Sequence, residues 1–408
     1  MALRRLDAAL RLGRRELERL VKLGESRAID GAAMCHAVAF NGLAGGLPLA
    51  GLRQTLADEL AASRRAANLD ALLSLLEHEL PSQADADRVV RDPRLSTIQP
   101  DLIGEAAIIA AFTGSSTRQA EAPTIVRRAY ALGPDGAAQS LVRLVQDFAY
   151  ALEERGATED EKAAGRQVMG WLLTLTREIE DAEQLEPLAE ALPSNTTILR
   201  EIAAELTARI AAFYRREAER NNHWTVVDRA AGWTNNLAVR LGALGRREAA
   251  LEAAEEAVRL RRDLAAARPD AFTPDLAASL NNLAALLSAL GRREAALAAA
   301  EEAVRLYRDL AAARPDAFTP DLARSLWVLG DLLAEAGHSE QALSTLREGV
   351  ARLTPAFAAL PAAYSDLMIG IVRSYVSQCD ALGCEPDMVL LAPVLAVFKR
   401  LQSEGSEG

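Results

Sequence analysis

Residues that could carry out chemistry are few in this sequence, and they are scattered. Only four histidines occur: His36, His78, His223 and His338. Cys35 and His36 could pair a thiol nucleophile with a base, but adjacent residues of a helix point in different directions. A free cysteine in an apolar run is more often a packed core residue. The pair therefore predicts core packing, not nucleophilic catalysis.

Metal-binding patterns are equally weak. Cys379 and Cys384 are five residues apart and have no second Cys or His pair nearby, which disfavours a zinc site. His78 lies between Glu77 and Glu79, without the H-E-x-x-H spacing that holds zinc on a helix. We therefore expect no metal site, no cofactor and no catalytic residue, and we predict a protein that is not an enzyme.

Composition and charge narrow the class of protein. Half of the 408 residues are apolar, a quarter are charged and only 4% are aromatic, which indicates a folded protein with a core of small aliphatic side chains. The net charge of −11 disfavours a general nucleic-acid binder. The most apolar stretch, Leu102 to Phe112, is too short to span a bilayer. With no signal-peptide pattern and three cysteines, we expect a cytoplasmic protein without a membrane partner.

A repeat of 46 residues is the strongest pattern in the sequence. The segment Gly245 to Ser279 matches the segment Gly291 to Ser325 at all but three of 35 positions. The same offset leads on to Gly337 and then to Gly383, so diverged units follow the two near-identical ones. Such self-similarity predicts a stacked array of supersecondary units.

Each unit is predicted to contain two helices. The first runs from about Asp275 to Leu290, where apolar residues recur every three or four positions, and Gly291 ends it. The second runs from Arg292 to about Arg314 and is stopped by Pro315.

The links between units carry helix-start signals. A Thr-Pro-Asp trio in each link is predicted to cap and begin the next first helix, at Thr273, Pro274 and Asp275, and again at Thr319, Pro320 and Asp321. Phe272 and Phe318 would then lie in connecting loops and fill the seams between units.

The unit resembles a tetratricopeptide repeat. The residues that carry this resemblance are Asn281-Asn282-Leu283-Ala284, Leu287, Gly291, Ala296, Ala300 and Ala303. The NNLA start resembles the long repeats of kinesin light chains and their bacterial relatives. The resemblance covers about Trp233 to Val350, and more weakly Thr354 to Leu401. It implies an all-helical solenoid that binds a protein or peptide in its groove, although 46 residues exceed the usual period of about 34.

Paired asparagines are the most informative polar residues of the repeat. Asn is a mediocre helix former, so its recurrence in the first helix of each unit needs a reason. By the resemblance, the first Asn of each pair points towards the groove, where an amide can hold the backbone of an extended peptide. Alternatively, these amides bond between adjacent repeats and stabilise the stack.

Three further residues occupy related positions. Trp327 replaces the first Asn in the third unit, with Asp331 one turn later, and is either an aromatic anchor or a cover for the change to diverged repeats. Arg240 stands where later units have Leu and is either a groove charge or an end effect. The predicted partner-binding residues are therefore Asn235, Asn236, Arg240, Asn281, Asn282, Trp327 and Asp331.

The N-terminal half is helical without a period. After an amphipathic first helix, further helices are predicted at about 30–40, 47–60 and 68–80. Two short β-rich runs, Arg88 to Val90 and Leu95 to Ile98, flank an Asp92-Pro93 turn and suggest a small hairpin. Helices followed by a hairpin are the outline of a winged-helix domain.

This half resembles the region after the nucleotide-binding core of bacterial STAND-type signalling ATPases. The resemblance rests on Leu75 to Glu79 and Pro100 to Glu105 and covers about Leu43 to Thr207. The chain contains no G-x-x-x-x-G-K-[ST] phosphate loop, so no nucleotide-binding residue is carried over.

The sequence thus predicts an all-α chain: a helical, winged-helix-like domain at 1–100, a helical linker domain at 101–222, tetratricopeptide-like repeats at 223–350 and a degenerate repeat with a cap at 351–408. The favoured function is a scaffold that binds a protein or peptide in the repeat groove. The alternative is the sensor and arm of a STAND-type ATPase whose ATPase core is a separate partner. A winged-helix DNA-binding regulator is disfavoured, because the recognition helix at 68–80 has acidic residues and no Arg or Lys.

Overall fold

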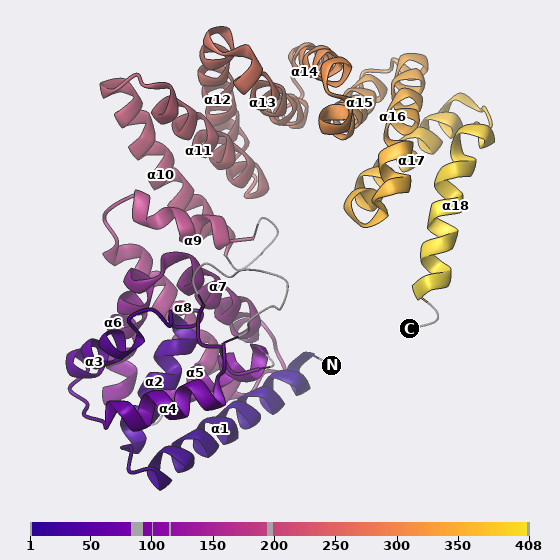
Figure 1. Cartoon of the computed structure of the whole chain (residues 1–408). Helices are drawn as coiled ribbons and strands as arrows, with labels where there is room; N and C mark the ends of the chain where they lie inside the picture. The colour runs from indigo at the N-terminus through magenta and orange to yellow at the C-terminus, as the bar shows by residue number, and fades with distance from the viewer. Residues whose placement is uncertain (1, 83–92, 100, 114–115, 194–198, 406–408) are drawn as a thin grey trace. The chain divides into compact units, whose positions relative to one another are not determined.

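All regular secondary structure in the described part of the chain is helical. The computed structural model describes residues 2–82, 93–99, 101–113, 116–193 and 199–405. The chain divides into two units, Met1–Leu206 and Thr207–Gly408. Figure 1 shows the helices of both units, and helix α10 (Arg200–Arg220) begins in the first unit and continues into the second.

The first unit is a bundle of helices of unequal length. In chain order they are α1 (Ala2–Ser26), α2 (Gly31–Leu43), α3 (Leu52–Ala62), α4 (Leu69–Glu79), α5 (Asp101–Thr113), α6 (Ser116–Leu132), α7 (Pro134–Ala149), η1 (Tyr150–Leu152), α8 (Glu159–Glu178), η2 (Glu183–Leu185) and α9 (Glu186–Ala191). Local signals set several starts: Asp30 accepts a hydrogen bond from the Ala33 amide, and Thr158 and Glu161 form a capping box.

Close helix contact holds α1 against α5. A Cβ on Gly13 would lie 2.6 Å from the Cβ of Ala106, so only glycine allows the two backbones to approach this far. Leu20, Met34 and Phe148 are fully buried in the surrounding core. Because the core is built from aliphatic side chains with few rings, small residues at the crossings determine its packing.

The segment predicted to form a hairpin is not a pair of strands where it is described. Arg88 to Val90 lies outside the described residues. Leu95 to Ile98 forms no strand; Arg94 makes an isolated antiparallel bridge with Pro48. The Leu95 amide donates to the Leu47 carbonyl at 2.8 Å. The backbone of this run therefore forms hydrogen bonds with the loop after α2 and not with a second strand. Leu95 and Ile98 are buried.

The second unit confirms the predicted helical-repeat solenoid. Its helices follow one another in chain order in Figure 1. They are α11 (Trp224–Ala243), α12 (Arg247–Ala267), α13 (Pro269–Ala289), α14 (Arg293–Ala313), α15 (Pro315–Glu335), α16 (Ser339–Ala359), α17 (Pro361–Leu382) and α18 (Met388–Gly405). The odd-numbered helices from α11 are the first helices of successive repeats, and the even-numbered ones are the second helices.

The period of 46 residues is kept in the helix starts. First helices α13, α15 and α17 begin at Pro269, Pro315 and Pro361. Second helices α12, α14 and α16 begin at Arg247, Arg293 and Ser339, with the same spacing. α18 breaks this series, since it begins at Met388, three residues later than the period requires.

The predicted start of each first helix is wrong by five residues, about one and a half turns. α13 and α15 begin at Pro269 and Pro315, and a single residue, Arg268 or Arg314, separates each from the preceding helix. Proline at the first helical position has a fitting φ and lacks only an amide that would be unpaired there. The Thr-Pro-Asp trio thus lies within the helix, and Phe272 is buried in its first turns, 5.9 Å from the Trp224 ring.

The packed face of α10 follows the same pattern as the second helices. Ile210, Ala211 and Tyr214 are buried, as are Ala257, Val258 and Arg261 at the matching positions of α12. Tyr307 takes this last position in α14. The C-terminal part of α10 therefore occupies the place of a second helix before α11.

Glycine is required at the turn inside each repeat. Gly245, Gly291, Gly337 and Gly383 have φ between 65° and 84°, as predicted for a helix end in the left-handed region. We expect Gly291→Ala to lower the free energy of unfolding of the second unit by about 1 kcal/mol, because alanine is strained at this φ although its Cβ would meet no atom.

Thermal unfolding checks this expectation. Gly170→Ala is the control: it lies inside α8, its Cβ would also meet no atom, and its φ is not positive. Alanine should stabilise a helix interior by about 0.5–1 kcal/mol. A Gly291→Ala protein as stable as the wild type would contradict the assignment of strain.

Candidate functional site

One side of the first helices carries residues that reach the surface. Positions four, seven and eleven residues after the first lie on one side of a helix, and the same positions recur in each repeat. We call this side the first-helix face; its residues are Gly232, Asn236, Val239 and Ala243 on α11, Ala278, Asn282, Ala285 and Ala289 on α13, and Arg324, Val328, Asp331 and Glu335 on α15. Each is exposed or half-buried.

The chemistry of the first-helix face changes along the array. On α11 and α13 it consists of small apolar side chains and two amides, and Val239 is 45% exposed. On α15 it becomes charged, with Arg324, Asp331 and Glu335. The small side chains leave room for the backbone of another chain to approach closely.

The paired asparagines lie at the seams between repeats. Asn281 is 8% exposed, and its Nδ2 donates to Ser325 Oγ of the next repeat at 2.7 Å. The Nδ2 of Asn282 donates to Asn235 Oδ1 of the preceding repeat at 3.1 Å. Asn236 makes no such contact and is exposed. Asn281 therefore lies inside the stack, whereas Asn236 and Asn282 reach the first-helix face.

Trp327 takes up the same kind of position one repeat later. Its Nε1 donates to Ser374 Oγ on α17 at 3.0 Å, and its ring covers Gly370, where a Cβ would come within 2.5 Å of the indole. Asp331 is half-buried beside it; burial raises the pKa of Asp331, and Ser374 and Trp327 oppose this rise. The indole thus lies between the third and fourth repeats, and Asp331 lies at the edge of the first-helix face.

Arg240 is half-buried on α11, one position after Val239. Burial lowers the pKa of its guanidinium, because the charged form loses hydration. The structure thus brings four of the seven predicted residues, Asn236, Arg240, Asn282 and Asp331, to the first-helix face or its edge. The other three, Asn235, Asn281 and Trp327, form hydrogen bonds in the seams between repeats.

Ion pairs join the second helices of neighbouring repeats, and the last of these pairs uses Asp387, which directly precedes α18. Arg262 contacts Glu302 at 2.5 Å, Arg308 contacts Glu348 at 2.7 Å, and Arg347 contacts Asp387 at 2.7 Å. Each pair spans 40 residues and links one repeat to the next. Six charged residues are therefore used to join neighbouring repeats.

A buried polar network lies in the first unit, where the sequence predicted only core packing. Glu59 on α3 is 4% exposed and receives hydrogen bonds from Arg128 Nε at 2.6 Å and Nη2 at 2.7 Å. His36 Nε2 is 2.7 Å from Glu59 Oε1 and 3.1 Å from Ser63 Oγ. Burial favours the neutral form of Glu59, but the hydrogen bonds from Arg128 and His36 and the charge of Arg128 outweigh it and lower its pKa to about 2.

The geometry of this network differs from that of a catalytic triad. A Ser-His-acid triad needs the serine and the acid on different imidazole nitrogens. Here Ser63 and Glu59 both contact Nε2 of His36. The network joins α2, α3 and α6, and no reaction follows from it.

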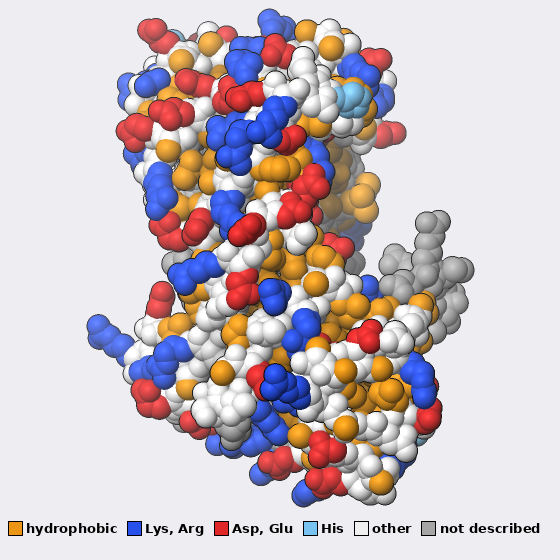
Figure 2. Space-filling model, turned by 90° about the vertical axis from the view of Figure 1, so that its left-hand side faces the viewer, with side chains coloured by type: hydrophobic (Ala, Val, Ile, Leu, Met, Phe, Trp, Pro, Cys, Tyr) orange, Lys and Arg blue, Asp and Glu red, His pale blue; other side chains and the backbone are white. Residues whose placement is uncertain are grey.

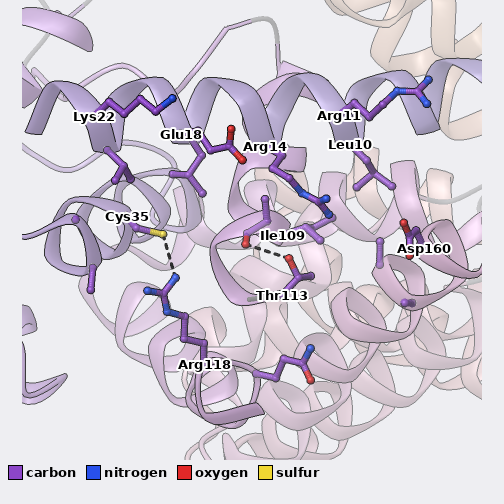
Figure 3. Close-up of a pocket in the computed structure, with 18 of the residues that line it drawn as sticks. Leu10, Arg11, Arg14, Glu18, Lys22, Cys35, Ile109, Thr113, Arg118 and Asp160 are labelled. Carbon is purple, nitrogen blue, oxygen red and sulfur yellow. Dashed lines mark hydrogen bonds between the residues drawn. The ribbon is translucent and has the colours of Figure 1, made fainter. Parts of the chain in front are cut away.

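A pocket of about 960 Å³ opens between α1, α2, α5, α6 and α8 of the first unit. Figure 3 shows Arg11, Arg14 and Lys22 along α1, with Cys35 and Arg118 across from them. The Cys35 thiol is 3.8 Å from Arg118 Nη1, yet burial outweighs the arginine and raises the thiol pKa. A thiol with a raised pKa is a poor nucleophile, which agrees with the predicted core role of Cys35.

Glu105 is a second buried carboxyl group of the first unit. It is 4% exposed, and Arg143 Nε lies 3.6 Å from its Oε1. Burial, reinforced by Asp147, raises its pKa to about 9. The group is therefore protonated in the folded protein at neutral pH.

Glu105→Gln is expected to flatten the pH dependence of stability. The folded pKa lies above the unfolded one, so the contribution of Glu105 to stability is full below about pH 4.5 and is lost as the pH rises towards 9. Urea unfolding should show that the free energy of unfolding of the variant increases relative to that of the wild type as the pH rises across this range. Exposed Glu153→Gln is the control. A wild-type slope retained by Glu105→Gln would contradict the assignment.

Other surface and site features are plain. On the face shown in Figure 2, acidic and basic side chains are interspersed with apolar ones. Within the described ranges, no group of three or more His, Cys, Asp or Glu side chains could hold a metal ion. No helix among the described residues has the length and apolar character needed to cross a membrane.

Sequence comparison identifies the repeats. Residues 231–265 and 276–311 match the sequence model of the tetratricopeptide repeat. These segments cover about the last two thirds of α11 and α13 and nearly all of α12 and α14, so this stretch contains tetratricopeptide repeats, as the NNLA pattern predicted. No curated protein matches the chain.

Two solved structures are similar at low identity. BtubC (BKLC) from P. vanneervenii is 20% identical with a TM-score of 0.32, over 59% of this chain and 89% of that one. A Signal Transduction ATPase with Numerous Domains (STAND) protein with a tetratricopeptide repeat sensor, from Pyrococcus horikoshii, is 11% identical with a TM-score of 0.32, over 90% of this chain. This chain spans 64% of the length of the STAND protein. Nothing about the ligand of this chain follows from likenesses this distant.

Proposed function

We propose that the tetratricopeptide-repeat array is a scaffold that binds a segment of another protein along the first-helix face of α11, α13 and α15. The observation that carries this proposal is the difference between the two sides of the array. Ion pairs between repeats use the charges of the second helices. The first helices α11 and α13 instead present small apolar side chains and amides, among them Val239 at 45% exposure.

The face suits a peptide with a mixed surface. Ala278, Ala285 and Ala289 form an exposed stripe on α13 with no long side chain, so a ligand backbone can approach it closely. The Asn236 amide can both donate to and accept from that backbone. Next to it, α15 offers Arg324, Asp331 and Glu335. We therefore expect a ligand segment that is apolar at one end and carries charges of both signs at the other.

The predicted partner-binding residues divide into two roles in this proposal. Asn236, Asn282 and Asp331 contact the ligand, and Arg240 borders it. Asn235, Asn281 and Trp327 position these residues, because their hydrogen bonds join one repeat to the next. A positioning residue acts through the curvature of the array, which follows from the rotation between neighbouring repeats.

Two matched alanine substitutions test the proposal. Peptides selected from a display library for binding to the wild type would be titrated against Ala285→Glu and Ala298→Glu. Both alanines are exposed in the same repeat, Ala285 on the first-helix face and Ala298 on α14. Glutamate must be tolerated at the second position, because Glu252 occupies it in the preceding repeat.

We expect Ala285→Glu to weaken binding at least about tenfold, the equivalent of about 1.4 kcal/mol, and Ala298→Glu to leave it unchanged. Peptides that bind both variants as they bind the wild type would refute the assignment to the first-helix face.

A further inference from the structure

The last helix, α18, is apolar on two sides. One side packs in the core of the second unit, with Leu391, Val394 and Val397 buried against residues of α16 and α17. The other side is exposed and also apolar: Met388 is 58%, Val389 86% and Leu395 41% exposed. From Met388 to Phe398 the helix contains no charged residue.

No helix among the described residues covers this exposed apolar side of α18. α18 has left the 46-residue period, so it does not continue the stack in register. Exposed, contiguous apolar surface of this kind is typical of an interaction site.

We propose that this side of α18 binds α18 of a second copy of the chain, with the two helices antiparallel. The spacing of the exposed residues supports this partner. With Ala392 opposite Ala392, Val389 faces Leu395 and Met388 faces Ala396 of the other copy. All of these residues are exposed, and the small Ala392 at the centre allows the helices to approach closely.

Charge complementarity favours this orientation. The same register places Glu385, just before the helix, opposite Lys399 of the second copy; both are exposed, and neither forms an ion pair within the described residues. Asp387 is excluded from this role because it pairs with Arg347 and accepts the Val389 amide. In a parallel pair, Glu385 would instead lie close to Glu385 of the second copy and Lys399 close to Lys399, and such pairs of like charges repel each other. A two-fold interface pairs the same surface on both copies, as here.

The interface is expected to be weak, and its consequence is bivalency. One helix pair buries less than the roughly 1,200–2,000 Å² of a standard interface, so we expect a dissociation constant on the order of 10 µM. A dimer carries two repeat arrays, and a ligand with two binding segments would then bind more tightly than one with a single segment.

Sedimentation equilibrium over a range of concentrations tests the proposal. We expect the wild-type chain to approach twice the monomer mass, and Val389→Glu and Leu395→Glu to remain monomers. The control is Leu360→Glu, because Leu360 is 61% exposed outside α18; this variant should dimerise like the wild type. Circular dichroism would show that all variants fold.

A charge exchange tests the orientation. Glu385→Lys and Lys399→Glu should each weaken the dimer several-fold, and the double variant should restore it. A wild-type protein that is monomeric up to about ten times the expected dissociation constant, or a dimer insensitive to Val389→Glu, would overturn the proposal. A dimer that the double variant fails to restore would overturn the antiparallel register.

Discussion

Arg128→Met is expected to destabilise the first unit by about 3–5 kcal/mol, because it leaves the buried Glu59 carboxylate without its counter-charge. Methionine keeps most of the apolar stem of arginine. The decrease in the free energy of unfolding therefore measures the loss of the guanidinium group and not the formation of a cavity. Urea unfolding, followed by hydrogen exchange in α2, α3 and α6, measures it. The neighbouring Arg127→Met is the control: Arg127 is 56% exposed and 3.6 Å from Glu178, so its loss should stay below about 1 kcal/mol.

The pH dependence gives this prediction a second test. The folded pKa of Glu59 is about 2, below its unfolded value of 4.5. Its contribution to stability is therefore present above about pH 4.5 and is lost as the pH falls towards 2. Without Arg128, only the contact with His36 still opposes the effect of burial on Glu59, so this acid-dependent loss should become smaller. A variant within 1 kcal/mol of the wild type at neutral pH would show that the Glu59–Arg128 pair is not stabilising.

Phe357→Ala is expected to lower the stability of the second unit by about 3–5 kcal/mol. Phe357 on α16 is fully buried, and its ring centroid is 5.0 Å from that of Phe398 on α18. Truncation leaves a cavity where α18 is attached, so amide protection should fall first in α18.

The control for this cavity is Phe318→Ala. Phe318 is half-buried, and Arg314 covers one side of its ring, so its truncation should cost clearly less. If α18 kept its protection in Phe357→Ala while α13 to α15 lost theirs, the attachment of α18 to α16 would be wrong.

Much of the repeat architecture could be predicted, because it is encoded locally. Gly245, Gly291 and Gly337 recur every 46 residues, and each occupies the left-handed turn that only glycine adopts easily. The NNLA pattern led to the tetratricopeptide family, which the family comparison confirms for α11 to α14. These features need no knowledge of distant contacts.

Other features depend on contacts that no local pattern records. Pro269 and Thr273 are both acceptable helix starts, and the choice depends on the one-residue link at Arg268. Arg128 and Glu59 are 69 residues apart, so no spacing rule predicts their network. The orientation of Asn281 likewise depends on Ser325 in the next repeat.

Several predictions remain predictions. These are the domain boundaries, a separate ATPase partner for the N-terminal half, and the partner-binding role of Asn235, Asn236, Arg240, Asn281, Asn282, Trp327 and Asp331. The main prediction is that the array binds a peptide along the first-helix face, and amide exchange tests it most directly. An amide near a bound peptide exchanges more slowly, whatever the identity of the side chains involved.

The decisive measurement is hydrogen–deuterium exchange of the wild-type chain with and without a selected peptide. If the array binds as proposed, protection will appear in the first helices α11, α13 and α15, around Asn236, Ala285 and Asp331. The second helices α12 and α14 and the first unit will be unchanged. Protection confined to α12 and α14, or to the pocket at Cys35 and Arg118, would contradict binding on the first-helix face.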